Sequence, residues 1–262
     1  MADALKDLPV AEKAAWYRRL ADFVGHQLIE GRETLASRTL RWWLDNRSPL
    51  TTIYFEAPDY LRTHPKVLET LAFHRRVFLT QEQARGTRRA PFWAGVIPRL
   101  QRQPGFQVWD LRMPLELTYE SLVDVAPTPA HVGWIQQFGT PVEKDLLASL
   151  RGFQLRSRVG LIGVPAGSSG NLLIKFNYYY CEARDRYDWD YSEQFTVPNP
   201  DYGSMLPNAV RPQEREVTVY HRNAKDVEDH GLAAPYDLVS YEWLARDPLL
   251  TYPETINWTR SL

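Results

Sequence analysis

Carboxylates are concentrated at one point of the sequence, in the run Asp185-Arg-Tyr-Asp188 with Asp190 just beyond it. Carboxylates this close repel one another unless a cation neutralises them or one of them keeps its proton. Such a set suits a divalent cation, which prefers oxygen ligands, or proton transfer by a carboxyl group with a raised pKa. We therefore take Asp185 and Asp188 as candidate acid–base residues, and Asp185, Asp188 and Asp190 as candidate metal ligands.

The same run also has a purely structural interpretation. Asp is common in turns because its side chain accepts hydrogen bonds from loop amides. The run lies where a predicted strand ends and a long polar segment begins, and chain segments of that kind also carry many functional sites. Spacing alone leaves both interpretations open.

A second candidate is the pair His221-Arg222, which follows a predicted strand. His titrates near neutral pH, and Arg offers a two-pronged donor for phosphate. Neighbouring strand residues point to opposite faces, so the two act together only if the strand ends and the chain turns at Asn223-Ala224. With the carboxylates on a divalent cation, His221 as acid or base and Arg222 on phosphate, the set would suit phosphoryl transfer. The alternative is an exposed strand end.

The elements that must position these residues follow from hydrophobic periodicity. Apolar residues at helical spacing predict helices over residues 8–31, 33–46 and 65–84, with Pro65 in a first turn. Alternation predicts a strand over 115–123 and a hairpin of 153–164 and 172–183, connected by residues 165–170. Further predictions are a short helix at 142–150, a polar segment at 190–214, strands at 216–220 and 236–241, and a short helix at 223–230.

This order predicts an α+β fold in which N-terminal helices pack on a C-terminal antiparallel β-sheet or partly open barrel. The pattern changes near residue 104 without a flexible linker. We therefore expect one integrated domain over residues 1–262, mainly helical over 1–104 and mainly β over 105–262.

Composition argues against several classes of function. The chain has 31 basic and 32 acidic side chains, without the basic surplus of a nucleic-acid binder, so we expect no nucleic-acid partner. Its apolar runs are too short for a transmembrane segment, and its first residues lead into charged ones rather than a signal sequence. We expect a protein made in the cytoplasm and, if it acts elsewhere, exported by a route that needs no signal peptide.

Cofactor and cysteine chemistry are equally restricted. Residues 163–170 are glycine-rich but lack the Gly-Lys-Ser/Thr of a phosphate-binding loop, so we expect no organic cofactor. The single cysteine, Cys181, excludes an internal disulfide. We interpret Cys181 as a buried thiol in a strand rather than a nucleophile.

Three runs of the sequence carry a resemblance to a known family: residues 145–156, Asn177-Tyr-Tyr-Tyr, and Asp185-Arg-Tyr-Asp-Trp189. Together with Arg41-Trp42-Trp43, they resemble an uncharacterised family of proteobacterial proteins that are often encoded near type VI secretion genes. The matching region covers about half of the chain. The resemblance implies a role in a bacterial secretion system.

The run Asp185-Arg-Tyr-Asp188 is also similar to the active-site signature of colicin M-type bacteriocins, which hydrolyse a lipid-linked peptidoglycan precursor with magnesium. This similarity implies that Asp185, Tyr187 and Asp188 are catalytic, and that the metal, if one is used, is Mg²⁺. In those proteins His-Arg follows within a few residues, whereas here Gln194 and Phe195 stand near that position and His221-Arg222 comes later. Either the intervening segment is an insertion and the pair returns in space, or that half of the site is missing.

Two functional hypotheses follow. The first is an antibacterial effector, a toxin of interbacterial competition that hydrolyses a lipid-linked diphosphate. The second is a non-enzymatic partner of the secretion apparatus, such as an adaptor or an immunity protein. In the second, aromatic residues form the binding surface: Trp42, Trp43, Tyr178, Tyr179, Tyr180, Trp189 and Tyr191.

Overall fold

The computed structural model describes residues 3–27, 33–79, 115–125, 145–146, 149–150, 152–166, 171–189, 194–245 and 255–258. The chain divides into two compact units, each assembled from separate stretches of sequence. Unit 1 comprises Met1–Phe55, Asp124–Phe153 and Arg184–Val239, and unit 2 comprises Glu56–Val123, Gln154–Ala183 and Ser240–Leu262. The single integrated domain stays a prediction.

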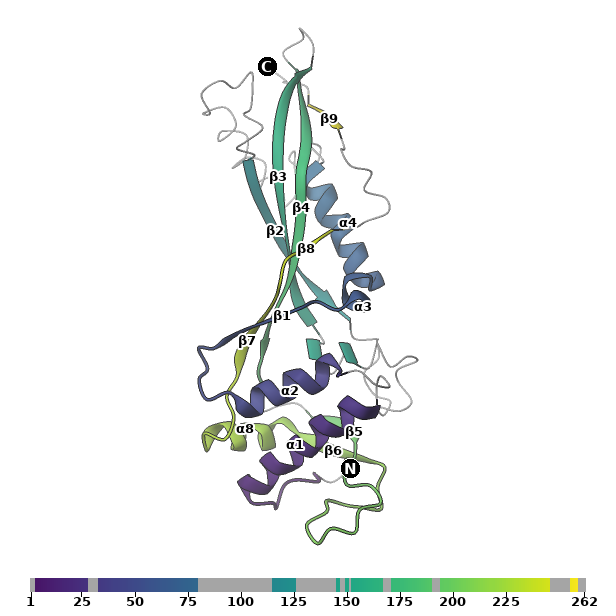
Figure 1. The fold of residues 1–262 in the computed structure, drawn as a ribbon, viewed down its shortest axis with the longest axis vertical. Coiled ribbons are helices and arrows are strands. Elements are labelled where there is room, and N and C mark those ends of the chain that lie inside the picture. Colours follow the sequence, from purple (N-terminus) through teal and green to yellow (C-terminus); the bar gives the residue numbers. More distant parts are fainter. Residues whose placement is uncertain are drawn as a thin grey trace. The chain divides into compact units, whose positions relative to one another are not determined.

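The main sheet has the strand order β1-β7-β4-β3-β2 (Figure 1). Its strands are β1 (Thr52–Phe55), β7 (Tyr236–Ser240), β4 (Asn171–Tyr187), β3 (Gly152–Ala166) and β2 (Leu115–Asp124). Two further strands, β8 (Trp243–Leu244) and β9 (Thr255–Trp258), pair with β4 in antiparallel fashion. Helices at the front of the chain and this sheet, built mostly from its later part, confirm the predicted α+β class.

Unit 1 contains the helices α1 (Val10–Gln27), α2 (Leu35–Asp45) and α8 (His221–Asp229). The residues that α1 buries recur at helical spacing, which is why it packs against its neighbours: Trp16, Tyr17, Leu20, Ala21 and Val24. The start of α2 is capped twice. Thr34 Oγ1 accepts a hydrogen bond from the Ser37 amide at 3.1 Å, and the buried Asp145 carboxylate accepts from the amides of Leu35 and Ala36.

Unit 1 also holds a separate two-stranded sheet of β5 (Gln194–Pro198) and β6 (Glu216–Tyr220). The strands are antiparallel, with Gln194 opposite Tyr220 and Phe195 opposite Val219. The polar segment predicted over 190–214 thus contains a strand. In Figure 1 the two strands lie beside α1 and α8.

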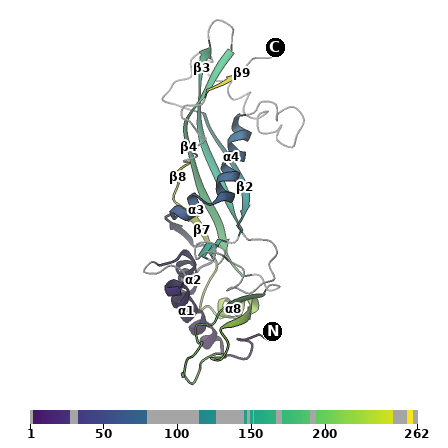
Figure 2. The same cartoon turned by 90° about the vertical axis from the view of Figure 1, so that its right-hand side faces the viewer.

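Unit 2 is built on the long hairpin of β3 and β4, with the short α3 (Asp59–Arg62) and with α4 (Pro65–Leu79) along the sheet (Figures 1 and 2). One face of the hairpin is core: His74 of α4 lies between Ser121 of β2 and Ser157 of β3. Tyr179 of β4 donates to the carbonyl oxygen of Leu71 at 3.1 Å. Cys181 is buried in β4, as expected from the sequence.

Several sequence predictions can be compared with these bounds. The helices predicted at 8–31, 33–46 and 223–230 correspond to α1, α2 and α8, and the 65–84 helix to α4, whose described part ends at Leu79. Residues 80–114, which include the predicted end of this helix, lie outside the described residues. Of the helices that can be described, none combines the length and apolar character needed to cross a membrane.

Candidate functional site

The carboxyl end of β4 positions Asp185 and Tyr187 on one face of the sheet. In the antiparallel register with β7, Asp185 stands opposite Leu238 and Tyr187 opposite Tyr236. The rings of Tyr187 and Tyr236 stack, with centroids 5.3 Å apart and an interplanar angle of 14°. Tyr236 donates its hydroxyl to the carbonyl oxygen of Thr39 in α2 at 2.8 Å, so this face is turned towards α2.

Arg186 lies on the opposite face of the same strand. Its guanidinium pairs with Asp237 of β7, with 2.7 Å between Nη1 and Oδ1. Because the chain at Asp185 is a regular strand, the interpretation of Asp185-Arg-Tyr-Asp188 as a turn is wrong for its first three residues. Only Asp188 lies beyond the strand end.

Asp185 is a half-buried carboxyl group with little local support for its charge. Its Oδ1 accepts a hydrogen bond from the Arg186 amide at 2.8 Å. Burial raises the pKa of Asp185 to about 7; the Arg186 amide opposes this shift, and the charge of Asp188 adds to it. A carboxyl group with this pKa is partly protonated at neutral pH, which suits a general acid or base.

Asp188 differs from Asp185 in its surroundings. Its side chain is 57% exposed, and its Oδ2 lies 4.0 Å from Arg186 Nε. Asp190, the third proposed ligand, lies outside the described residues. Among the residues that are described, no group of three or more His, Cys, Asp or Glu side chains could hold a metal ion. The assignment of Mg²⁺ to Asp185, Asp188 and Asp190 stays a prediction.

His221 and Arg222 begin a helix. Strand β6 ends at Tyr220 and α8 starts at His221 without an intervening loop. The interpretation of the pair as an exposed strand end is therefore wrong. His221 and Arg222 could act together only if the chain changed direction near Asn223-Ala224. It does change direction, but at His221, two residues earlier than predicted.

His221 lies beside the end of β4. Its ring meets the edge of the Trp189 ring with 5.0 Å between centroids, and it meets Phe195 at 5.2 Å. Trp189 in turn contacts Tyr187 at 5.9 Å. Because β5 and β6 pair, the chain folds back after Phe195 and returns His221 to that residue. His221 thus lies beside Trp189 and Phe195, and the interpretation of the intervening segment as an insertion stays a prediction.

Arg222 is held elsewhere. Its Nη2 lies 2.8 Å from Asp3 Oδ2, and its guanidinium lies over the Tyr220 ring at 4.6 Å. Asp3 also accepts a hydrogen bond from Asn223 at 2.9 Å, so the N-terminal segment binds the start of α8. Within the described part of the chain, neither Asp185 nor Asp188 is a partner of Arg222. The predicted pair is thus divided between two environments.

Two residues of α1 and α2 complete the surroundings of Trp189. Tyr17 and Trp43 are fully buried, and their rings meet edge to face at 5.3 Å. Both also contact Trp189, at 5.8 and 5.4 Å. We call the resulting group the aromatic cluster: Tyr17, Trp43, Tyr187, Trp189, Phe195 and His221.

The sequence analysis did not single out Tyr17, although its position is chemically unusual. Its hydroxyl and the Trp189 indole nitrogen are buried without a hydrogen-bond partner among the described residues. Burial raises the pKa of Tyr17, and the charges of Asp3, Tyr187 and Asp226 add to the rise. Each unpaired buried polar group costs about 1–3 kcal/mol, which makes the cluster a costly arrangement. The adjacent aromatics Trp16-Tyr17 on a buried helix face were the available sequence signal.

Compared with known proteins, the chain matches no family model, no curated protein and no solved structure.

Proposed function

We propose that the chain is an antibacterial effector of a bacterial secretion system, and that it hydrolyses a lipid-linked diphosphate of the cell envelope at the end of β4. The observation that supports this most is Asp185, a half-buried carboxyl group with a pKa of about 7. The similarity of Asp185-Arg-Tyr-Asp188 to the colicin M signature supplies the substrate class.

The chemistry assigned to Asp185 is general base catalysis. Hydrolysis of a phosphodiester needs a water molecule to attack phosphorus while its proton is removed and a phosphorus–oxygen bond breaks. Asp185 would take the proton, and His221, held beside Trp189, would give a proton to the leaving oxygen. Binding of phosphate by Arg222 would require its guanidinium to leave Asp3.

A burial cost also supports a functional role for Asp185. A carboxylate that is ionised at neutral pH despite burial lowers the stability of the fold. Residues of this kind are typical of functional sites, where stability and activity make opposite demands. If Asp185 is functional, replacing it should raise the stability of the fold and abolish activity.

The test is expression of the protein directed to the periplasm of a susceptible bacterium. We expect the unaltered chain to cause lysis and Asp185→Asn to abolish it. Asp237→Asn is the matched control because Asp237 lies on the opposite face of the same sheet region, paired with Arg186. The proposal would be contradicted if Asp185→Asn caused as much lysis as the unaltered chain. It would also be contradicted if the unaltered chain caused no lysis.

The second candidate is a non-enzymatic component, such as an adaptor or immunity protein. It is favoured by Arg222, which is bound to Asp3 rather than directed to the carboxylates. Its predicted binding surface needs correction, because Trp43 and Tyr179 are core residues and Trp189 belongs to the aromatic cluster. Tyr191 lies outside the described residues. Under this candidate, Asp185→Asn leaves function intact.

A further inference from the structure

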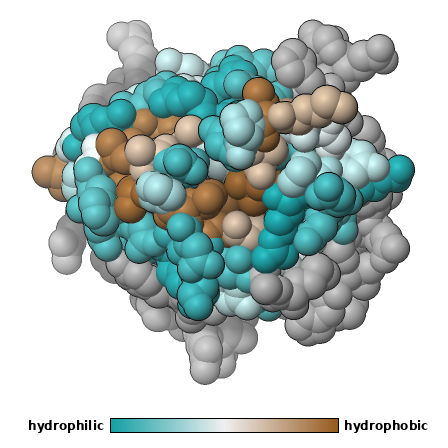
Figure 3. Space-filling model, turned by 90° about the horizontal axis from the view of Figure 1, so that it is seen from below, coloured by the Kyte–Doolittle hydropathy of each residue, from teal (hydrophilic) through white to brown (hydrophobic). Residues whose placement is uncertain are grey.

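The connection between β5 and β6 exposes large apolar side chains. We call residues 199–215 the β5–β6 loop. Met205 is 100% exposed, Leu206 58% and Tyr202 49%. Viewed from the end of unit 1 where this loop lies, apolar surface gathers in the middle of the face with hydrophilic residues around it (Figure 3). Exposed apolar patches of this kind on soluble proteins are typical of interaction sites.

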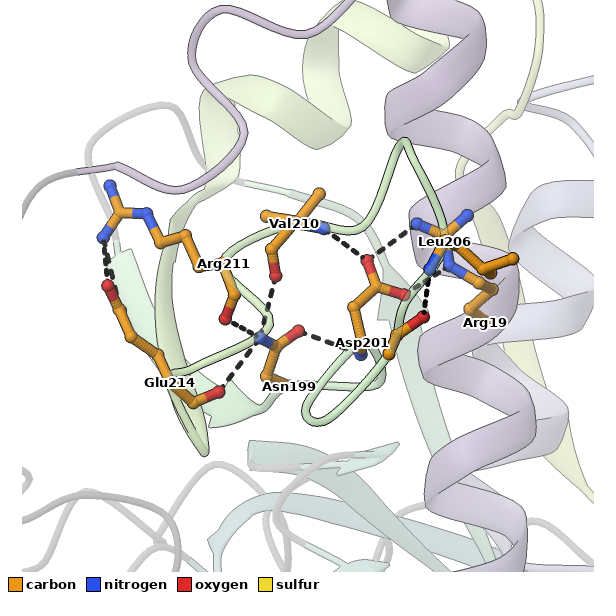
Figure 4. A network of polar contacts seen from close by, with 8 residues as sticks. Arg19, Asn199, Asp201, Leu206, Val210, Arg211 and Glu214 are labelled. Atoms are coloured by element: carbon orange, nitrogen blue, oxygen red, sulfur yellow. Dashed lines mark hydrogen bonds and ion pairs between the residues drawn. The ribbon is translucent and has the colours of Figure 1, made fainter.

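The loop is held in one shape by buried polar side chains (Figure 4). Asn199, fully buried, directs its amide nitrogen to the carbonyl oxygens of Val210, Arg211 and Glu214 at 2.9, 2.9 and 3.0 Å. Its side-chain oxygen accepts from the Asp201 amide at 3.1 Å. One side chain thus fixes both ends of the loop.

Asp201 fixes the middle of the loop to α1. Its side chain is 2% exposed and accepts two hydrogen bonds from the Arg19 guanidinium, at 2.7 and 2.9 Å. It also accepts from the Val210 amide at 2.8 Å. A two-pronged Arg–carboxylate pair fixes orientation as well as distance. The anchor to α1 and the exposed Tyr202, Met205 and Leu206 thus belong to one fixed loop.

The backbone of the loop contains a strained residue, which its surroundings must hold in place. Arg211 has φ of +46°, in the left-handed region that non-glycine residues rarely adopt. Such strain costs about 1–3 kcal/mol and persists only where the surroundings fix it. A loop fixed in advance loses little conformational entropy when it binds, which raises affinity.

The charges of the loop favour a protein over a membrane. Its two acidic residues, Asp201 and Glu214, balance its two basic residues, Arg211 and Arg215. Arg211 pairs with Glu214, and Asp201 with Arg19, whereas anionic membranes attract clusters of basic residues. Arg215 remains exposed, with its guanidinium over the Tyr202 ring at 5.4 Å.

We propose that the β5–β6 loop is a docking element that inserts Met205 and Leu206 into an apolar pocket of a folded protein partner. A carboxylate at the rim of that pocket pairs with Arg215. Tyr, Met and Arg are the residues enriched in protein interfaces. The proposal is independent of the catalytic one, since it uses none of the residues at the end of β4.

The first step of the test places a photo-crosslinking amino acid at position 205 of the full chain in its native host, and at position 50 as the control. Leu50 is also in unit 1, is 88% exposed and lies outside the loop. We expect position 205, and not position 50, to capture one protein. No capture at 205, or capture of copies of this chain only, overturns the proposal.

The second step measures the affinity of the purified captured protein. We expect the combined change Met205→Asp and Leu206→Asp to weaken binding at least about 100-fold, and Leu50→Asp to leave it unchanged. Asn199→Ala should weaken binding about 10-fold although it keeps every exposed side chain. Arg215→Glu should weaken binding of the partner. Replacing the carboxylate residue at the rim of the partner's pocket by Lys should restore it. The proposal is overturned if Leu50→Asp weakens binding of the captured protein as much as the changes at 205 and 206. It is also overturned if the chain binds phosphatidylglycerol vesicles and Leu206→Asp abolishes that binding.

Discussion

The imidazole ring of His221 meets the edge of the Trp189 ring, with 5.0 Å between centroids. Trp189 directly follows the Asp185-Arg-Tyr-Asp188 run, so this contact joins two segments that are far apart in the sequence. The hairpin of β5 and β6 produces it by reversing the chain between them. Whichever function is correct, His221 and the end of β4 belong to one packed group.

Asp185→Asn should stabilise the fold above neutral pH. The folded-state pKa of Asp185 is about 7, above its ordinary value of 3.8, so the folded protein holds the extra proton between these pH values. The free energy of unfolding therefore falls as pH rises from about 4 to 7. Allowing for solvent screening of a half-buried group, we expect Asn to gain about 1–3 kcal/mol at pH 8. Urea unfolding at pH 5 and pH 8 measures this, and an equal effect at both values would contradict it.

His74 should produce the opposite pH dependence. Burial lowers its pKa to about 4, and the hydroxyl oxygens of Ser157 and Ser121 lie 2.7 and 2.6 Å from its two ring nitrogens. The unfolded chain binds this proton at about pH 6.5, so stability is lost as pH falls from about 6.5 to 4, by about 2–3 kcal/mol. His74→Gln should flatten the profile of urea midpoints over this range. His230→Gln, at an exposed helix end, is the control for the same change of residue type outside the core.

The core elements were predictable because their signals are local. Apolar residues at helical spacing define α1 and α2, and strict alternation defines the hairpin of β3 and β4. Strand β5 was missed because Gln194–Pro198 is short, ends in proline and lies among polar residues. The start of α8 was missed because Tyr220, at the N-cap, makes no side-chain capping hydrogen bond.

The site was less predictable because its contacts join distant residues. No local pattern indicates that Asp3 would bind Arg222, or that Tyr17 would lie beside Trp189. The run at Asp185 was found from its charge, but the sequence did not show that Asp185 lies within β4 while Asp188 follows its end. Residue types thus indicated candidate residues for the site, whereas contacts between distant parts of the chain determine which of them lie together.

Asp145→Ala should destabilise unit 1. The carboxylate of Asp145 is fully buried and accepts hydrogen bonds from the Leu35 and Ala36 amides, at 3.0 and 2.6 Å. Removing it leaves two amides of the α2 start unpaired, at a cost of about 2–4 kcal/mol. Asp45→Ala, at the exposed other end of α2, is the control and should cost about 0–1 kcal/mol. Urea unfolding compares the two, and equal losses would refute the capping role.

Gly160→Ala should destabilise unit 2 through a single side chain. A Cβ atom at this position would stand 2.5 Å from Cε1 of Tyr178, on the neighbouring strand β4. Tyr178 is confined by Arg158, whose guanidinium lies 5.4 Å from its ring centroid and is bound to Glu242 at 2.7 Å. We expect a loss of about 1–3 kcal/mol in the free energy of unfolding.

A double-mutant cycle separates this clash from backbone strain. If the ring of Tyr178 causes the loss, Gly160→Ala should cost much less in a Tyr178→Ala background, with a coupling energy of about 1 kcal/mol or more by urea unfolding. Gly203→Ala is the matched control: its φ is +73° and nothing lies within 4 Å of the added Cβ. Its cost arises from the backbone alone, so Tyr178→Ala should not reduce it. Additive effects of Gly160→Ala and Tyr178→Ala would show that the glycine is required for another reason.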